Sequence, residues 1–76
     1  MVTKPLVITS RNSADGLLCV DVFQRTDGSF GFEEFRRDPE DASGWYAVGG
    51  FSDLRFNSAR DADQDAATRV SWYGDS

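Results

Sequence analysis

The sequence contains no histidine, only one cysteine and only one lysine, and these shortages exclude whole classes of chemistry. Without histidine, the chain lacks the commonest general base and the usual ligand of zinc, iron and copper sites. The lone Cys19 cannot form an internal disulfide, and its place within an apolar run predicts a buried structural thiol. No glycine-rich loop precedes a helix in a pattern that binds phosphate. We therefore expect a protein that is not an enzyme and that holds no metal or cofactor.

Long apolar runs and a strong positive charge are missing as well. The N-terminal stretch MVTKPLVITSRNS has only a short apolar run, which is too short for a signal peptide or a membrane span. Thirteen carboxylates against eight bases give a net charge of −5, which disfavours non-specific binding to nucleic acid or to an anionic membrane. We expect a soluble, cytoplasmic protein whose partner is another protein.

The aromatic content, by contrast, is generous for a chain of 76 residues, and six Phe, two Trp and two Tyr can fill a small core. Turn-forming clusters separate β-prone runs over most of the chain, and one helical pattern follows them. We expect a single α+β domain, in which a three- or four-stranded antiparallel sheet packs against one C-terminal helix. Its parts are a loosely attached segment over residues 1–16, the sheet over 17–56 and the helix over 58–73.

The central hairpin has a register that can be argued from its side chains. A two-residue loop at Asp27 and Gly28 would mix apolar and charged residues on both faces of the hairpin. A three-residue loop with Gly28 in the left-handed conformation sets Val22 opposite Phe32 instead. This register predicts a core face of Val20, Val22, Phe30 and Phe32, and an outer face of Cys19, Asp21, Phe23, Glu33 and Phe35.

The helical pattern begins after Asn57, where Ser58 is the expected N-cap. Asp65 and Arg69 lie one turn apart and are expected to pair. An apolar stripe recurs at steps of three and four, formed by Ala59, Ala62, Ala66, Val70 and Tyr73. Because this stripe would pack on the apolar face of the sheet, we expect one shared core of Val20, Val22, Phe32, Ala62, Ala66 and Val70.

The stretch GGFSDLRFNSARDADQDAATRV resembles the closing strand and alanine-rich helix of the plant ethylene-response-factor type of DNA-binding domain. The same layout is similar to that of the small YegP-like bacterial proteins. The resemblance covers residues 18–73 and implies the fold. In the plant family, Arg and Trp residues on the sheet contact DNA, whereas the corresponding strands here carry carboxylates beside Arg25, Arg36 and Arg37. A sheet-face nucleic-acid binder that uses these arginines is therefore an alternative function.

Carboxylates gather at two places in the chain and form the first candidate binding surface, which consists of Asp38, Glu40, Asp41, Asp61, Asp63 and Asp65. Spaced carboxylates on a small rigid body can imitate a phosphate backbone. Phage anti-CRISPR proteins, many of which are short, acidic and poor in histidine, are similar in type. The sequence from Asp61 also begins like a calcium-binding loop, but Ala66 and Trp72 stand where that loop needs Gly and Glu, so we expect no metal site.

Aromatic residues form the second candidate surface, which consists of Phe23, Phe35 and Tyr46 on the outer face of the sheet. Exposed aromatics within a charged rim are typical of partner sites, unless residues 5–9 fold across this face and bury it. The sequence thus predicts a small acidic protein-binding module. Its sharpest version is an inhibitor that imitates nucleic acid and blocks a nucleic-acid-binding complex. The alternatives are the sheet-face nucleic-acid binder and a homodimeric bacterial protein.

Overall fold

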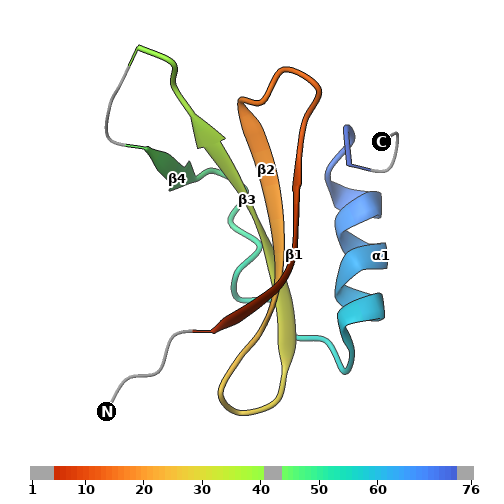
Figure 1. The fold of residues 1–76 in the computed structure, drawn as a ribbon. Helices are drawn as coiled ribbons and strands as arrows, with labels where there is room; N and C mark the ends of the chain where they lie inside the picture. The colour runs from red at the N-terminus through yellow and green to blue at the C-terminus, as the bar shows by residue number, and fades with distance from the viewer. Residues whose placement is uncertain (1–4, 41–43, 74–76) are drawn as a thin grey trace.

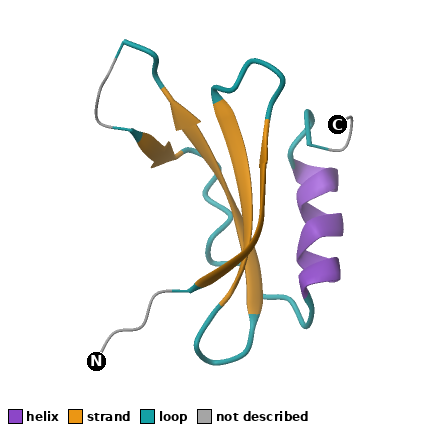
Figure 2. Cartoon of the chain, viewed as in Figure 1, coloured by secondary structure: helices purple, strands orange, loops and turns teal. Residues whose placement is uncertain are grey.

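The computed structural model describes residues 5–40 and 44–73 and shows one antiparallel sheet with a helix beside it (Figure 1). The strands follow one another across the sheet in the order β1-β2-β3-β4, and α1 covers one side of the sheet (Figure 2). The expected α+β fold is confirmed, with four strands in the sheet. The elements are β1 (Leu6–Asn12), β2 (Leu18–Gln24), β3 (Phe30–Arg37), β4 (Trp45–Ala47) and α1 (Ala59–Arg69).

The β2–β3 hairpin has the predicted register, because Val22 pairs with Phe32. Its turn is closed by the backbone N–H of Arg25, which donates to the carbonyl of Ser29 at 2.8 Å. Gly28 lies within this three-residue loop with a φ of 91°, a conformation that glycine adopts without a steric cost. The left-handed glycine and the three-residue loop are therefore both confirmed.

The core lies between α1 and the inner face of β2 and β3. Phe32 is fully buried at its centre, and its ring centroid lies 5.1 Å from that of Phe51 and 5.8 Å from that of Phe56. The alanines of α1 allow the helix to approach these large rings closely, so small and large surfaces fill the space together. The predicted core is confirmed, since one buried cluster contains Val20, Val22, Phe32, Ala62, Ala66 and Val70, together with Tyr73.

The helix begins as expected but ends earlier. The Oγ of Ser58 accepts a hydrogen bond from the backbone N–H of Asp61 at 3.1 Å, which confirms the N-cap. The helix stops at Arg69 and not at residue 73, because Val70 has an extended backbone, with φ −105° and ψ 107°. The turn that follows directs Trp72 back toward the sheet, where its Nε1 donates to a glutamate of β3 at 2.8 Å. Packing against the sheet thus ends the helix before the apolar stripe ends.

The segment before residue 17, which the sequence marks as loosely attached, contains an ordered edge strand. Strand β1 pairs with β2 along its length, with a bulge between Val7 and Thr9. It therefore extends the sheet sideways and does not fold across the outer face. The hairpin between β1 and β2 is closed by Asp15, whose Oδ1 accepts hydrogen bonds from the Oγ of Ser13 at 2.6 Å and the N–H of Leu17 at 3.0 Å. These bonds hold the pKa of the Asp15 carboxyl below its usual range.

Residues 48–56 run from β4 to α1 along the free edge of β3. The N–H of Val48 donates to the carbonyl of Glu34 at 3.0 Å, and Phe30 and Phe56 exchange two backbone hydrogen bonds at 3.0 and 2.9 Å. This segment carries Phe51 and Phe56 into the core although it has no periodic pattern. In the described part of the chain, no helix is long and apolar enough to span a membrane.

Candidate binding surface on the outer sheet face

The predicted acidic residues do not form one continuous surface. Asp38 and Glu40 lie in the turn after β3, which Figure 1 shows on the opposite side of the molecule from α1. The Oδ1 of Asp38 accepts a hydrogen bond from the N–H of Glu40 at 3.0 Å, so this carboxylate shapes its own turn. Asp41, the third predicted residue of this turn, lies outside the described residues.

The carboxylates of α1 are partly occupied by contacts within the protein. Asp63 accepts a hydrogen bond from the hydroxyl of Tyr73, and Asp65 pairs with Arg69 at 2.5 Å between Oδ2 and Nε, as the spacing predicted. Burial, together with the bond to Asp63, raises the pKa of Tyr73 to about 12. Asp61 is exposed, but so are Arg60 beside it and Arg69 at the end of the helix. The outward side of the helix therefore mixes both signs of charge.

The outer face of the sheet brings together aromatic residues from three strands. Phe23 of β2 and Phe35 of β3 lie on it, half-buried, as the sequence predicted. Tyr46 pairs with Arg36, and because side chains alternate along a strand it belongs to the other face. Trp45 takes its place on the outer face, since it pairs with Arg37.

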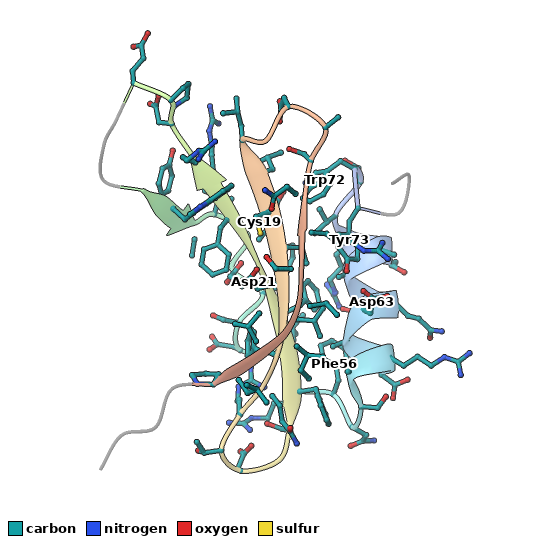
Figure 3. All side chains as sticks on the ribbon, viewed as in Figure 1. Cys19, Asp21, Phe56, Asp63, Trp72 and Tyr73 are labelled. Atoms are coloured by element: carbon teal, nitrogen blue, oxygen red, sulfur yellow. The ribbon has the colours of Figure 1, made fainter. Side chains whose placement is uncertain are left out.

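These residues line a shallow, open groove on the side of the sheet away from α1. The groove has two halves, and both are bounded by Asp21 and Phe35. Figure 3 shows Cys19 and Asp21 on this side of the sheet, whereas Tyr73 and Asp63 lie between the sheet and the helix. Beyond the two shared residues, one half is lined by Ser10, Asn12, Cys19 and Trp45, and the other by Pro5, Val7, Phe23, Glu33, Ala47 and Ser52.

Arginine side chains stack on the aromatic rings at the two ends of the groove. The guanidinium of Arg37 lies 5.2 Å from the ring centroid of Trp45, and that of Arg25 lies 5.0 Å from the ring centroid of Phe23. Arg25 also donates to the backbone carbonyls of Phe30 and Leu54, each at 3.1 Å, and to that of Ser52. Arg25 therefore joins the β2–β3 hairpin to the segment before α1, which is a structural role.

Gly31 lies beneath the stacked pair at one end of the groove. A Cβ atom at this position would lie 2.7 Å from Nη2 of Arg25 and 3.0 Å from Cε1 of Phe23. The guanidinium would have to shift and the Phe23 ring would be unusually close, so a larger residue at position 31 would disturb the stacked pair. The register predicted from the sequence sets Phe23 opposite this glycine, as the structure does, but the sequence gave no sign of the arginine that joins them.

Glu33 forms part of the groove wall and is the one buried charged residue among those described, with 3% of its surface exposed. Its Oε1 accepts hydrogen bonds from the N–H groups of Phe51 at 3.2 Å and Ser52 at 3.1 Å. Its Oε2 accepts from the N–H of Glu34 at 2.8 Å. The carboxylate therefore accepts the backbone hydrogen bonds from residues 51 and 52 that a neighbouring strand would otherwise accept. The sequence indicated only an outward-facing acid, because the segment that uses it has no regular pattern.

Asp21 and Cys19 lie in the middle of the outer face and are joined to β1 by hydrogen bonds. The Oδ1 of Asp21 accepts from the Oγ of Ser10 at 2.7 Å and from the Sγ of Cys19 at 3.3 Å. Cys19 is 6% exposed, and its burial raises the pKa of the thiol. The thiol is therefore protonated at neutral pH and serves as a hydrogen-bond donor, in keeping with the structural role predicted. Among residues 5–40 and 44–73, no three His, Cys, Asp or Glu side chains are grouped as metal ligands.

No family model, curated protein or solved structure matches the chain. The likeness to the plant DNA-binding domain and to the YegP-like proteins therefore stays an expectation from sequence.

Proposed function

We propose that this protein is a non-enzymatic protein-binding module that docks its partner on the outer face of the sheet. The observation that carries the proposal is the one-sided packing of the sheet. The core and α1 lie against the inner face, whereas no described element lies across the outer face, where Phe23, Phe35 and Trp45 border the groove. An apolar surface of this kind, rimmed by charged residues, is typical of a protein-binding site.

The acidic version of the proposal, an inhibitor that imitates nucleic acid, draws less support from the geometry. Such an inhibitor needs carboxylates in a regular row that faces the partner. Here Asp63 and Asp65 already bind Tyr73 and Arg69, and the acidic turn after β3 lies on the other side of the molecule. We therefore propose the groove as the docking surface. Imitation of nucleic acid by the carboxylates is the competing version, and the experiment has to distinguish the two.

One observation favours the nucleic-acid-binding alternative. Arg37 stacked on the exposed Trp45 combines a cation with an aromatic surface, and single-stranded nucleic acids bind to such combinations. Against it, Arg25 is committed to three backbone carbonyls, and the net charge of −5 opposes the approach of a polyanion. Protein binding therefore remains the conclusion that the surface supports best.

The test compares what immobilised variants capture from a lysate of the source cells, with and without nuclease. Phe35→Ser changes the middle of the groove, and Asp61→Lys, on the exposed start of α1, is the control. Circular dichroism establishes that each variant is folded. We expect the wild type and the control to capture the same identified proteins, with or without nuclease, and Phe35→Ser to lose them.

Three other results would contradict this reading. Loss of capture in Asp61→Lys alone would favour charge mimicry of nucleic acid. Capture that disappears on nuclease treatment would favour the nucleic-acid binder. Equal capture by all three proteins would remove the groove from consideration as the docking surface.

A further inference from the structure

Among the described residues of the outer face, Asp21 is the one carboxylate that has an oxygen open to a partner. It lies where the two halves of the groove meet, between the aromatic residues Phe23 and Phe35. Both described hydrogen bonds to this residue go to Oδ1, from Ser10 and Cys19. Within residues 5–40 and 44–73, Oδ2 accepts no hydrogen bond. Glu33, the other acid of the groove, is occupied through both of its oxygens.

No base of the described chain forms an ion pair with Asp21. The two ion pairs of the described residues join Arg55 to Asp27 and Arg69 to Asp65. On the outer face itself, the two arginines stack on aromatic rings at the ends of the groove. Among the described residues, no base thus compensates the negative charge of Asp21 within this apolar surface.

We infer that the groove binds an extended peptide segment in which a lysine or arginine lies between apolar residues, with the cation at Asp21 and the apolar side chains on the aromatic rings. This inference rests on the proposed function and deepens it, because it names the chemistry of the partner. The bonds from Ser10 and Cys19 fix the carboxylate before the partner arrives, so little side-chain entropy is lost on binding.

The length of the groove sets the length of the segment. Cys19 and Phe23 mark its extent along β2, which corresponds to about 13 Å at ~3.3 Å per residue. An extended peptide of about four or five residues covers that distance. Because alternate side chains of an extended peptide point the same way, a central cation with an apolar residue two positions away on each side fits this length.

Charge also distinguishes this occupant from a second copy of the same chain. Each copy carries a net charge of −5, so two copies repel each other, whereas a cationic peptide is attracted over a long range. An acidic peptide would meet Asp21 with a charge of the same sign. A basic-apolar segment is the occupant that satisfies both the charge and the apolar lining.

The test uses fluorescence anisotropy with a fluorescein-labelled pentapeptide, Val-Ser-Lys-Ser-Leu, in which the lysine and both apolar side chains share one face of the extended chain, and two matched peptides that carry norleucine or glutamate in place of lysine. We expect the wild type to bind the lysine peptide about tenfold more tightly than the norleucine peptide, as for a charge-assisted hydrogen bond, and the glutamate peptide most weakly. Asp21→Asn retains an oxygen for Ser10 and Cys19. This variant should lose the tenfold preference for the lysine peptide, while its affinity for the norleucine peptide should not fall.

Asp61→Asn is the matched control, because it removes the same charge from the far side of the molecule and should leave the preference unchanged. Equal binding of the lysine and norleucine peptides, an equal effect of both substitutions, or no binding of any peptide would overturn the inference. So would sedimentation of a dimer that Phe35→Ser dissociates, since the groove would then hold a second copy. If capture from the lysate still depends on Phe35 while the peptides show no preference, the inference fails and the proposed function stands.

Discussion

Removing the carboxylate of Glu33 should destabilise the whole domain although the residue lies outside the apolar core. Glu33→Ala leaves three backbone N–H groups without their acceptor, those of Phe51, Ser52 and Glu34. An unsatisfied buried donor costs about 1–3 kcal/mol. Water can reach the donor of Ser52, which is exposed, so most of the cost comes from the other two. We expect the free energy of unfolding to fall by about 2–6 kcal/mol.

That loss is large for a chain of this size. At about 0.05–0.15 kcal/mol per residue, a chain of 76 residues has a total stability of about 4–11 kcal/mol. Urea titration followed by tryptophan fluorescence measures the difference, since Trp72 packs against the core. Glu33→Gln should have a smaller effect, because its amide keeps one oxygen as an acceptor.

A second readout locates the effect. Amide hydrogen exchange of Phe51 and Ser52 should accelerate in Glu33→Ala, because both N–H groups lose their acceptor. Asp53→Ala is the control, since it removes an exposed carboxylate from the same segment and should change neither quantity. If Glu33→Ala matched this control in stability and in exchange, the carboxylate would not be what holds residues 51 and 52.

The remaining predictions concern the core, one close contact and two titrations. Phe32→Ala should lower the free energy of unfolding by about 3–5 kcal/mol in a urea titration, and an unchanged midpoint would refute the packing described. Gly49→Ala should lower the free energy of unfolding by about 1–3 kcal/mol, because a Cβ there would lie 2.5 Å from the Phe51 ring and 2.7 Å from Oε2 of Glu33. An unchanged free energy of unfolding would show that both neighbours can move. Since the pKa of Tyr73 is raised from 10.0 to about 12, its contribution to stability is complete below pH 10 and is lost as the pH rises toward 12. Tyr73→Phe should flatten this decline in stability. Identical profiles of stability against pH for the variant and the wild type would contradict the raised pKa. The pKa of Asp27 is lowered from 3.8 by hydrogen bonds from Ser29 and Arg55, so its contribution to stability is present above pH 3.8 and is lost as the pH falls below it. Asp27→Asn should reduce the loss of stability in acid. An unchanged profile of stability against pH in acid would contradict this prediction.

Local patterns account for the parts of the fold that the sequence predicted. The register of the β2–β3 hairpin followed from the requirement that one face be apolar, and Gly28 supplied the loop that this register needs. The N-cap at Ser58 and the pair of Asp65 with Arg69 depend on residues within one helical turn of each other. Periodicity and near-neighbour chemistry were sufficient for these features.

The missed features depend on residues far apart in the sequence or on segments without periodicity. Arg25 reaches the carbonyls of Ser52 and Leu54, and Glu33 reaches the N–H of Phe51, and no pattern along the chain marks such bonds. Whether residues 1–16 join the sheet was left open by the sequence, because β1 has a bulge and is exposed along its length, so its side chains show no alternation of burial. The pairing partner β2 determines its structure.

The candidate groove was predicted only in part, because some of its residues belong to long regular strands and others do not. Phe23 and Phe35 belong to long strands whose register is fixed, and both were placed correctly on the outer face. Tyr46 was predicted where Trp45 lies, because β4 has only three residues and so short an alternation does not show which of two neighbouring aromatics faces outward. Asp21 was assigned to the outer face, but its open oxygen became visible only with the bonds from Ser10 and Cys19.

The one-sided packing of the sheet has a consequence for how this protein can change. Along β2 and β3, alternate residues serve separate purposes: Val22 and Phe32 hold the domain together, while Asp21 and Phe35 meet whatever lies outside. Natural variants or a designed library can therefore alter the outward residues, and with them the choice of partner, at little risk to folding. Glu33, Arg25, Cys19 and Gly31 are the exceptions on that face. Glu33 and Arg25 anchor the segment before α1, Cys19 is buried, and a side chain at Gly31 would displace the stacked pair. Adaptation to a new partner should thus proceed around these fixed positions.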